Sequence, residues 1–365
     1  MKPEALPPFL FGTDIVLRYE KSIQIRFSEK RQVLSSSPLN GGYREDLSAV
    51  FNFDETPAKG KKCVMRASTY EQHMELIAEE LGLNPTNCAG LSTAAHMKYA
   101  ASVSRSYNGT SVTAIVTGGI NKNGGRAGDP ASWDEHAFNE ENRRHGTVNI
   151  MLAVDSHLSQ GAMAKAVITA TEAKTAAIQE LLAQSFYSDG LATGTGTDGI
   201  IVIANPQSDI YLTDAGQHSK LGELIGSTVL AAVKRALYLQ TGLGYQQQHN
   251  VFSRMRRFGV TEQSITERFL ESQPSPEEIK LFRLRMKEVA SQDNLLTYTS
   301  LYAHLLDQLK WGMLLPKEAV FAANNLLCLM EMPCRLSDSS DDSYIQMIAQ
   351  YRNGFFYGLP LGACL

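Results

Sequence analysis

The sequence has few cysteines, and no two of them stand close together. The five are Cys63, Cys88, Cys328, Cys334 and Cys364. They are odd in number and form no C-x-x-C pair, so neither a disulfide framework nor a zinc knuckle is predicted. We expect the thiols to be reduced.

Long apolar runs are also absent. A membrane-spanning helix needs about 18 consecutive apolar residues, and no stretch of the sequence is that long. The N-terminal stretch MKPEALPPFLFG has neither a long enough apolar segment nor the small-residue cleavage site of a signal peptide. We therefore expect a cytoplasmic protein that does not enter a membrane.

An excess of one charge is missing too. The chain has 34 lysines and arginines against 38 aspartates and glutamates, a net charge of −4, which does not favour nucleic-acid binding. The eight histidines do not cluster with cysteine or aspartate at metal-ligand spacing, apart from the polar stretch WDEHAFNEENRRH. We predict no protein-bound metal and no cofactor.

Hydrophobic periodicity predicts the secondary structure. From Asp14 to Phe53 apolar and polar residues alternate, which indicates an antiparallel meander. Asn108-Gly109 lies between two alternating runs, the strongest short-range signal for a hairpin. The pattern also predicts helices at 69–81, 161–184 and 221–239 and strands at 148–154 and 200–203. The predicted fold class is α+β, with a layered, mostly antiparallel sheet and packed helices.

The pattern changes after about His249. Segments such as EEIKLFRLRMKEVA and LYAHLLDQLKWGM have apolar residues at a period of 3.6, and no strand pattern occurs between them. We predict two domains: an α+β domain at 1–245 and an all-helical C-terminal domain or extension at 246–365.

The stretch TGTGTDGIIVIAN, residues 193–205, contains the spacing G-x-G-x-x-G at Gly194, Gly196 and Gly199. In a dinucleotide-binding fold this motif follows a strand and opens a helix, whose free N–H groups hold the pyrophosphate. Here the glycines come first and a β-branched run follows, which indicates a buried strand. We therefore expect a different role for these glycines, namely a close approach of backbone to a ligand.

Several Thr-, Gly- and Asn-rich segments occur in a fixed order: SSSPLNGG, GLSTAAHM, TGGINKNGGRAGD, HGTVNIML, ITATEAKT and ATGTGTDGIIV. Together they resemble the adenosylcobinamide amidohydrolase family of corrinoid salvage enzymes, the CbiZ type, over roughly residues 11–239. The resemblance implies hydrolysis of the amide between the aminopropanol arm and the corrin ring of adenosylcobinamide, giving adenosylcobyric acid and 1-aminopropan-2-ol. The cobalt would arrive with the substrate.

Amide hydrolysis needs an attacking oxygen with a base, donors for the oxyanion and an acid for the leaving amine. The sequence has no G-x-S-x-G elbow and no H-E-x-x-H, so the candidates are carboxylates, a lysine and a histidine in or near glycine-rich turns. We select Asp198, Lys174, Glu172 and His145 as candidate catalytic residues.

Each candidate has a plainer interpretation. Lys174 lies on the apolar face of its helix, where it could be a site residue or a snorkelling side chain. Glu172 is about 200° around that helix, at roughly 100° per residue, so the two cannot point into one pocket from a straight helix, and a solvated residue is the plainer interpretation. Asp198 could be a base or a turn-stabilising carboxylate. His145 could be a general acid or a polar residue at a strand edge.

The candidate substrate-binding residues are Asn40, Arg126, Asp129, Asn149, Thr195 and Gly196. The two asparagines could bind carboxamides of the corrin, or could bond only to nearby backbone. Arg126 and Asp129 could contact the ligand, or could form an ion pair that holds their loop, which we favour slightly.

Two alternatives stay open. Cleavage between Gly146 and Thr147 could free Thr147 as an N-terminal nucleophile whose own amine is the base. Alternatively, the protein could bind a corrinoid without turning it over. A homo-oligomer is compatible with either alternative.

Overall fold

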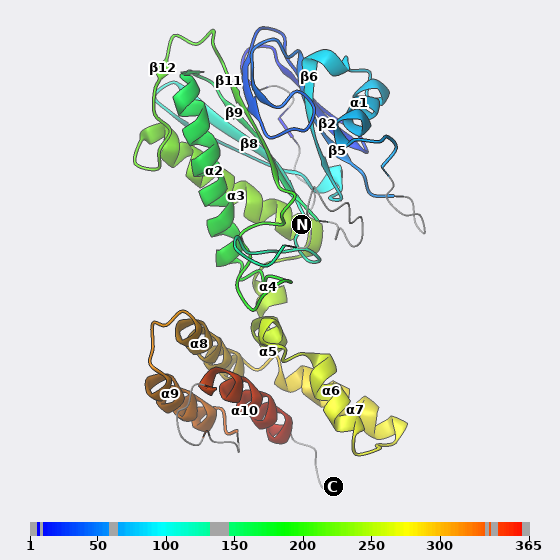
Figure 1. Ribbon diagram of the computed structural model, residues 1–365, viewed down its shortest axis with the longest axis vertical. Helices are drawn as coiled ribbons and strands as arrows, with labels where there is room; N and C mark the ends of the chain where they lie inside the picture. Colours follow the sequence, from blue (N-terminus) through cyan, green and yellow to red (C-terminus); the bar gives the residue numbers. More distant parts are fainter. Residues whose placement is uncertain are drawn as a thin grey trace. The chain divides into compact units, whose positions relative to one another are not determined.

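We describe the protein from a computed structural model, which describes residues 6–7, 10–57, 65–131, 146–332, 336 and 342–359. The chain forms two compact units, Met1–Gly244 and Tyr245–Leu365 (Figure 1). The first contains all the strands described, and the second contains only helices.

Two larger sheets and one small sheet make up the first unit. One sheet has the strand order β1-β2-β5-β6, the other has the order β4-β3-β11-β9-β8-β7, and β10 pairs with β12. Most neighbours are antiparallel, but β5–β6, β9–β11 and β10–β12 are parallel. The strands are β1 (Ile15–Arg18), β2 (Ser22–Arg26), β3 (Gln32–Ser35), β4 (Gly42–Arg44), β5 (Ala49–Asp54), β6 (Cys88–Thr93), β7 (Ala101–Tyr107), β8 (Thr110–Gly118), β9 (Val148–Val154), β10 (His157–Leu158), β11 (Gly199–Ala204) and β12 (Tyr211–Leu212).

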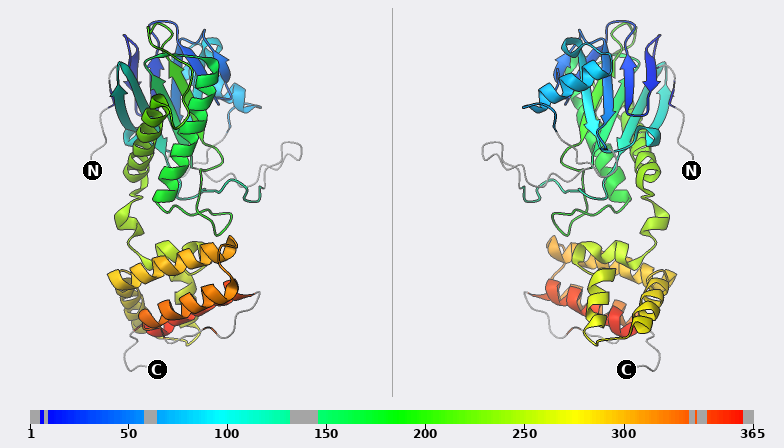
Figure 2. Two further views of the ribbon diagram at one scale, coloured as in Figure 1. Left: turned by 90° about the vertical axis from the view of Figure 1, so that its left-hand side faces the viewer. Right: turned by 90° about the vertical axis from the view of Figure 1, so that its right-hand side faces the viewer.

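The first unit has four layers. In Figure 1 the order from left to right is α2 (Gln160–Glu180) with α3 (Lys220–Thr241), the six-stranded sheet, the four-stranded sheet, and α1 (Tyr70–Glu80). The two side views show α2 and α3 in front of one face and α1 in front of the opposite face (Figure 2). Two short 3₁₀ turns, η1 (Pro85–Asn87) and η2 (Met97–Tyr99), flank β6. The predicted fold class is confirmed.

Three apolar clusters fill the spaces between these layers. Residues of α2 and α3 pack on one face of the six-stranded sheet, with Val116, Leu152 and Val202 fully buried. The other face of that sheet packs against the four-stranded sheet. Met74 and Ile77 of α1 cover the outer face of the four-stranded sheet. Both faces of the six-stranded sheet are therefore covered, which explains why β9 is buried at every position instead of alternating.

Local signals end the elements where the sequence predicts. The Thr69 hydroxyl accepts the Gln72 N–H at the start of α1, and Asn108-Gly109 connects β7 and β8 with positive φ at both residues.

The predicted meander is wrong in part. β1, β2 and β5 do pair antiparallel, but β3 pairs with β11 and β4 in the six-stranded sheet, where Val33 is buried between the two sheets.

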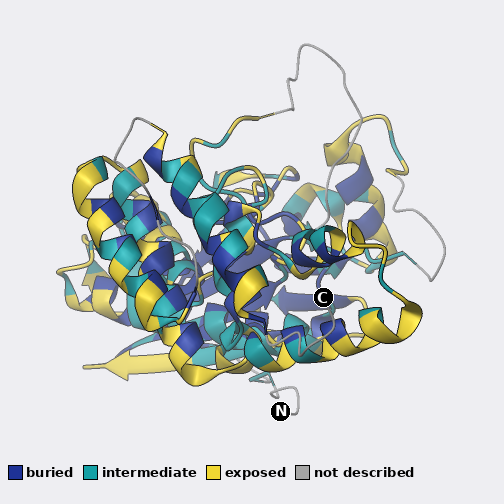
Figure 3. Ribbon diagram, turned by 90° about the horizontal axis from the view of Figure 1, so that it is seen from below, coloured by how far each residue is buried: buried dark blue, intermediate teal, exposed yellow. Residues whose placement is uncertain are grey.

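The second unit is all helical, as predicted for this part of the chain. Its helices are α4 (Tyr245–Gln248), α5 (Val251–Met255), α6 (Glu262–Leu270), α7 (Pro276–Val289), α8 (Asp293–Lys310), α9 (Pro316–Leu329) and α10 (Ser343–Gly358), with the 3₁₀ turn η3 (Arg256–Phe258). The helices alternate buried and exposed stripes (Figure 3), as the period of 3.6 requires. Tyr302 and Tyr351 lie in its core. No helix among the described residues is long and apolar enough to span a membrane.

Candidate active site

One end of the first unit collects most of the polar residues that the sequence singles out. The strands β5, β6 and β8 end there, while β9 and β11 begin there, as the pairs Gly118↔Val148 and Gly199↔Asn149 require. Strand ends leave backbone and side chains free to form a site, whereas strand interiors are occupied by packing. We therefore take this end as the candidate active site.

Lys174 of α2 and Asp198, the residue before β11, form an ion pair between Nζ and Oδ2. The two side chains are 11% and 14% exposed. Oδ1 of Asp198 also accepts the Val148 N–H (2.9 Å) and the Thr195 hydroxyl (2.6 Å), and Oδ2 accepts the Thr195 N–H (3.2 Å). A carboxylate accepts about four hydrogen bonds, so all its positions are occupied. This geometry favours the turn-stabilising interpretation of Asp198, and its role as a base stays a prediction.

The glycines of the G-x-G-x-x-G stretch have structural roles around this ion pair. A Cβ on Gly194 would lie 2.3 Å from the carboxylate and 2.9 Å from the ammonium. Gly196 has φ +77° and is exposed, so the predicted close approach of a ligand to its backbone stays open. A Cβ on Gly199 would lie 2.6 Å from a leucine of β6. Gly194 and Gly199 therefore leave room for the Lys174–Asp198 ion pair and for β6 to pack at the start of β11.

Three threonine hydroxyls connect the start of β9 to Asp198. The Thr147 and Thr197 hydroxyls are 2.8 Å apart, and that of Thr197 donates to the Gly146 carbonyl (2.8 Å). Thr197 Oγ1 lies 3.3 Å from Thr195 Oγ1, which donates to Asp198. Thr147 and Thr195 are buried, but Thr197 is exposed. Thr197 is not among the site residues predicted from the sequence, although it is the last threonine of the alternating stretch T-G-T-G-T.

Asn149 joins the two sheets below this network. Its amide donates to Asn52 Oδ1 (2.9 Å) and to the Ser92 carbonyl (2.8 Å), and its oxygen accepts the Gly199 N–H (3.1 Å). Asn52 in turn donates to the Thr117 hydroxyl (2.8 Å). Both amide hydrogens of Asn149 are used within the protein, so its role in binding carboxamides of a substrate stays a prediction.

Asn40 lies elsewhere. Its amide donates to the carbonyls of Pro85 (2.6 Å) and Cys88 (2.8 Å), and its oxygen accepts from Arg44 (3.0 Å). Cys88 is the first residue of β6, whereas Asn149 contacts Ser92 near the other end. The structure therefore does not bring Asn40 to the Lys174 end of the sheets.

Arg126 and Asp129 lie in the loop after β8, which reaches the glycine-rich stretch through a bridge between Gly125 and Gly194. Asp129 accepts the backbone N–H of Arg126 (2.8 Å) and the Ser185 hydroxyl (2.5 Å). Partial burial by itself would raise the pKa of Asp129, but these hydrogen bonds outweigh burial and hold the pKa below its usual value. Asp129 thus holds the loop through the Arg126 backbone N–H and the Ser185 hydroxyl.

Two catalytic candidates remain, Glu172 and His145. Glu172 is exposed on α2, while Lys174 is buried, so they occupy different faces as the helical rotation predicts. His145, together with the stretch WDEHAFNEENRRH, lies outside the described residues. Within the described part of the chain no group of three or more His, Cys, Asp or Glu could hold a metal ion.

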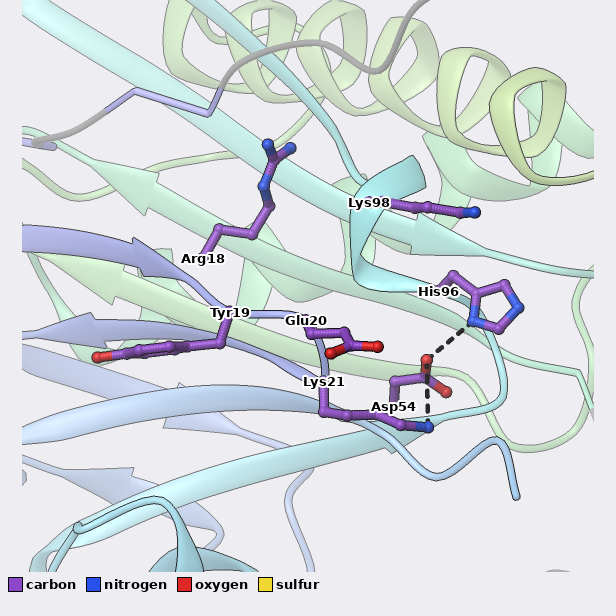
Figure 4. Close-up of a pocket in the computed structure, with 7 residues that line it drawn as sticks. All are labelled: Arg18, Tyr19, Glu20, Lys21, Asp54, His96 and Lys98. Atoms are coloured by element: carbon purple, nitrogen blue, oxygen red, sulfur yellow. Dashed lines mark hydrogen bonds and ion pairs between the residues drawn. The ribbon is translucent and has the colours of Figure 1, made fainter. Parts of the chain in front are cut away.

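A second charged cluster lines a pocket of about 430 Å³. In Figure 4 the His96 imidazole and the Lys21 ammonium both point toward the Asp54 carboxylate, at 3.0 and 3.7 Å. Asp54 is 2% exposed, whereas the His96 side chain is 44% exposed. The lining residues are Arg18, Tyr19, Glu20, Lys21, Asp54, His96 and Lys98.

This pocket belongs to the same end of the unit. Asp54 is the last residue of β5, two residues or about 7 Å of strand beyond Asn52, which contacts Asn149. Asp54 and Lys21 are not among the residues predicted from the sequence, because segments far apart in the sequence bring them together. A local signal does exist for Asp54, since it is the acidic residue that ends the alternating run of β5.

Comparison with known proteins identifies the family. The family model described as adenosylcobinamide amidohydrolase matches residues 11–245, nearly the whole first unit. The chain belongs to this family. An uncharacterised protein of Methanocaldococcus jannaschii is 33% identical over 64% of this chain and 92% of its own length. The adenosylcobinamide amidohydrolase of Methanosarcina mazei is 29% identical over 56% of this chain and 90% of its own length.

Among solved structures, a protein of Pyrococcus horikoshii OT3 matches 65% of this chain and 80% of its own chain, at 12% identity and a TM-score of 0.33.

The name of the matching family denotes hydrolases that act on an amide bond. The resemblance drawn from the ordered sequence segments is therefore confirmed.

Proposed function

We propose that the protein hydrolyses the amide between the aminopropanol arm and the corrin ring of adenosylcobinamide, giving adenosylcobyric acid and 1-aminopropan-2-ol. The observation that carries this proposal is the family match, which covers the unit that holds the candidate active site. The relative from Methanosarcina mazei bears the name of this activity.

The residues at the candidate active site suit amide hydrolysis. Lys174 supplies a positive charge that shares Asp198 with the Thr195 hydroxyl, where it stabilises negative charge that develops on a carbonyl oxygen. Asp198 positions this ammonium and holds the 195–197 turn against the start of β9. The exposed backbone at Gly196 lets a bulky substrate approach closely.

A corrinoid is a large substrate, and in this proposal it covers both charged clusters. The Asn52–Asn149 contact places Asp54 and Asp198 on the same end of the two sheets. The pocket around Asp54 is lined by the cations Arg18, Lys21 and Lys98, which suit polar or anionic groups on the substrate. In this proposal the cobalt belongs to the substrate, and the protein supplies no metal.

The test is an assay for 1-aminopropan-2-ol and adenosylcobyric acid by mass spectrometry, without added metal, flavin or nicotinamide. We expect turnover that a chelator does not abolish. Lys174→Met should remove turnover, because it keeps the apolar stem and deletes the charge. Lys165→Met is the matched control on the same helix, since Lys165 is exposed and pairs with Asp214.

Other outcomes would contradict the proposal. Corrinoid binding without release of aminopropanol would indicate a binding protein. Turnover that requires added zinc or manganese would contradict the metal-free reaction.

A further inference from the structure

We propose that the chain cleaves itself between Gly146 and Thr147, and that the new N-terminal threonine is the nucleophile for amide hydrolysis. The cleavage stands on contacts around this peptide bond alone. The role of Thr147 toward substrate rests on the proposed function.

The Gly146 carbonyl is held by two side-chain donors. The Asn123 amide donates to its oxygen at 2.5 Å, and the Thr197 hydroxyl donates at 2.8 Å. Asn123 is 1% exposed, so one of the two donors is fixed by its buried surroundings, whereas Thr197 is exposed. Two fixed donors on one carbonyl oxygen are what stabilises the oxyanion when a nucleophile adds to the carbon.

The Thr147 hydroxyl is in place to lose its proton. Thr197 directs its own hydrogen at the Gly146 carbonyl, so in the 2.8 Å contact between the two hydroxyls Thr147 is the donor. Beyond Thr197 the contacts continue through Thr195 to the Asp198 carboxylate, at 3.3 and 2.6 Å. Because Thr195 donates to Asp198 and Thr197 donates to the Gly146 carbonyl, the Thr147 proton is directed at Thr197, beside the carbonyl oxygen.

The backbone that follows the bond is held by two hydrogen bonds. The Gly119 N–H donates to the Thr147 carbonyl (3.0 Å), and the Val148 N–H donates to Asp198 (2.9 Å). Gly146 has φ +153°, and a Cβ there would lie 2.0 Å from Asn123 Oδ1. Only glycine permits Asn123 to approach this carbonyl, so the residue before the bond is dictated by the donor that polarises it.

One acceptor beside the bond has no donor in the intact chain. Asn123 Oδ1 is buried and has no hydrogen-bond partner among the described residues. It lies against Gly146, the residue before the bond that cleavage would break. An N-terminal ammonium at Thr147 would supply the missing donor.

Cleavage needs only water as co-reactant. Thr147 Oγ1 bonds to the Gly146 carbonyl carbon, its proton passes to the Thr197 hydroxyl, and Thr197 gives its own hydrogen to the Gly146 oxygen. The bond from this carbon to the Thr147 nitrogen then breaks, and the proton on the Gly146 oxygen moves to the nitrogen, which leaves as an amine. Water adds to the resulting ester, which releases the Gly146 carboxyl group and restores the Thr147 hydroxyl.

The same residue then acts on substrate. The freed α-amine takes the Oγ1 proton, Oγ1 bonds to the carbonyl carbon of the corrinoid amide, and the C–N bond breaks. Aminopropanol leaves with that proton, and water hydrolyses the ester to adenosylcobyric acid.

Intact-mass spectrometry of the purified full chain tests the cleavage directly. We expect two masses whose sum equals the full chain plus one water, and N-terminal sequencing of the second fragment should read T-V-N-I-M. Thr147→Ala should stay in one piece, and Thr147→Ser should still cleave. Thr197→Val should slow cleavage by roughly 10²-fold, because one oxyanion donor is lost, and Thr197→Ser should restore the rate.

Thr175→Val is the matched control, since the Thr175 hydroxyl donates to the Thr193 carbonyl and, among the described residues, has no hydrogen bond to Gly146, Thr147 or Thr197. It should cleave like the parent. Circular dichroism of each variant shows whether it is folded, and Thr147→Ser keeps the test informative if Thr147→Ala does not fold.

The outcomes separate this inference from the proposed function. A single intact mass for the parent overturns self-cleavage, whether or not the protein turns over substrate. Fragments that persist in Thr147→Ala, or that begin at another residue, also overturn it, because they indicate a foreign protease. Fragments beginning at Thr147 without release of aminopropanol uphold self-cleavage and refute the proposed activity.

Discussion

Replacing either partner of the Lys174–Asp198 ion pair should have unequal effects on stability. Asp198 accepts from three donors besides the lysine, namely two N–H groups and one hydroxyl. Among the described residues Lys174 has Asp198 as its side-chain partner. Loss of the lysine therefore leaves a carboxylate that is still bonded, but loss of the carboxylate leaves a buried cation.

The magnitudes follow from these contacts. In Asp198→Asn one oxygen becomes an NH₂ group that faces two donors, so two hydrogen bonds to a charged group are lost. At about 1.5–3 kcal/mol each, and reduced for partial exposure, the expected loss is about 3 kcal/mol. Lys174→Met removes one donor and keeps the apolar stem, so about 1–2 kcal/mol is expected. The double variant should lose less than the sum, by about 1–2 kcal/mol, because it buries no unpaired ammonium.

Hydrogen exchange followed by mass spectrometry can resolve these losses, because peptides from β9 and β11 report on this end of the sheets. The order of the two single variants is the decisive readout. If Lys174→Met costs as much as Asp198→Asn, the backbone donors do not hold the carboxylate and our reasoning fails. If Asp198→Asn leaves exchange unchanged but lowers turnover by roughly two to four orders of magnitude, Asp198 is a base and not a turn residue.

Further predictions address the two units separately. Gly194→Ala should disrupt the ion pair, because its Cβ would lie 2.3 Å from the carboxylate; unchanged exchange in β11 would contradict this. Burial raises the pKa of Cys88 to about 11, so iodoacetamide at pH 8 should label the exposed Cys328 and spare Cys88 until the protein unfolds, as peptide mapping can check. Burial also raises the pKa of Tyr302 in the folded state above its unfolded value near 10. Its contribution to stability is therefore complete below pH 10 and declines above it. Urea titrations should show a smaller decline in Tyr302→Phe than in the parent, where some decline remains because burial raises the pKa of Tyr351 as well. A chain ending at Gly244 should keep a cooperative unfolding transition by circular dichroism, and a broad transition would argue against an independent first unit.

Features encoded by neighbouring residues could be predicted from the sequence. The hairpin at Asn108-Gly109 and the bounds of β9 depend on turn chemistry and β-branched runs, which are local signals. The placement of Lys174 on a buried helix face likewise follows from helical periodicity.

Contacts between distant segments could not be predicted in this way. The sequence marks Asn149 as polar, but its partner Asn52 is 97 residues away in the other sheet. Asn40, like Asn149, is an asparagine in a polar, turn-rich stretch, but the tertiary structure places it at the opposite end of β6. The pocket around Asp54 likewise depends on the convergence of three strand ends and loops. Side-chain type alone does not encode which ends converge.

The pairing of β3 with β11 has a consequence for synthesis on the ribosome. Val33 pairs with Ile203, so β3 waits for about 170 more residues before its partner exists. At about 5–20 residues per second this interval lasts roughly 9–34 s, far longer than a helix or a hairpin needs to form. During that time the inner edge of β3 is unpaired, and the residues that will bury it have not left the ribosome. The nascent chain is therefore most exposed to misassociation in this window, and a chaperone that recognises strand edges would act on it before α3 is made.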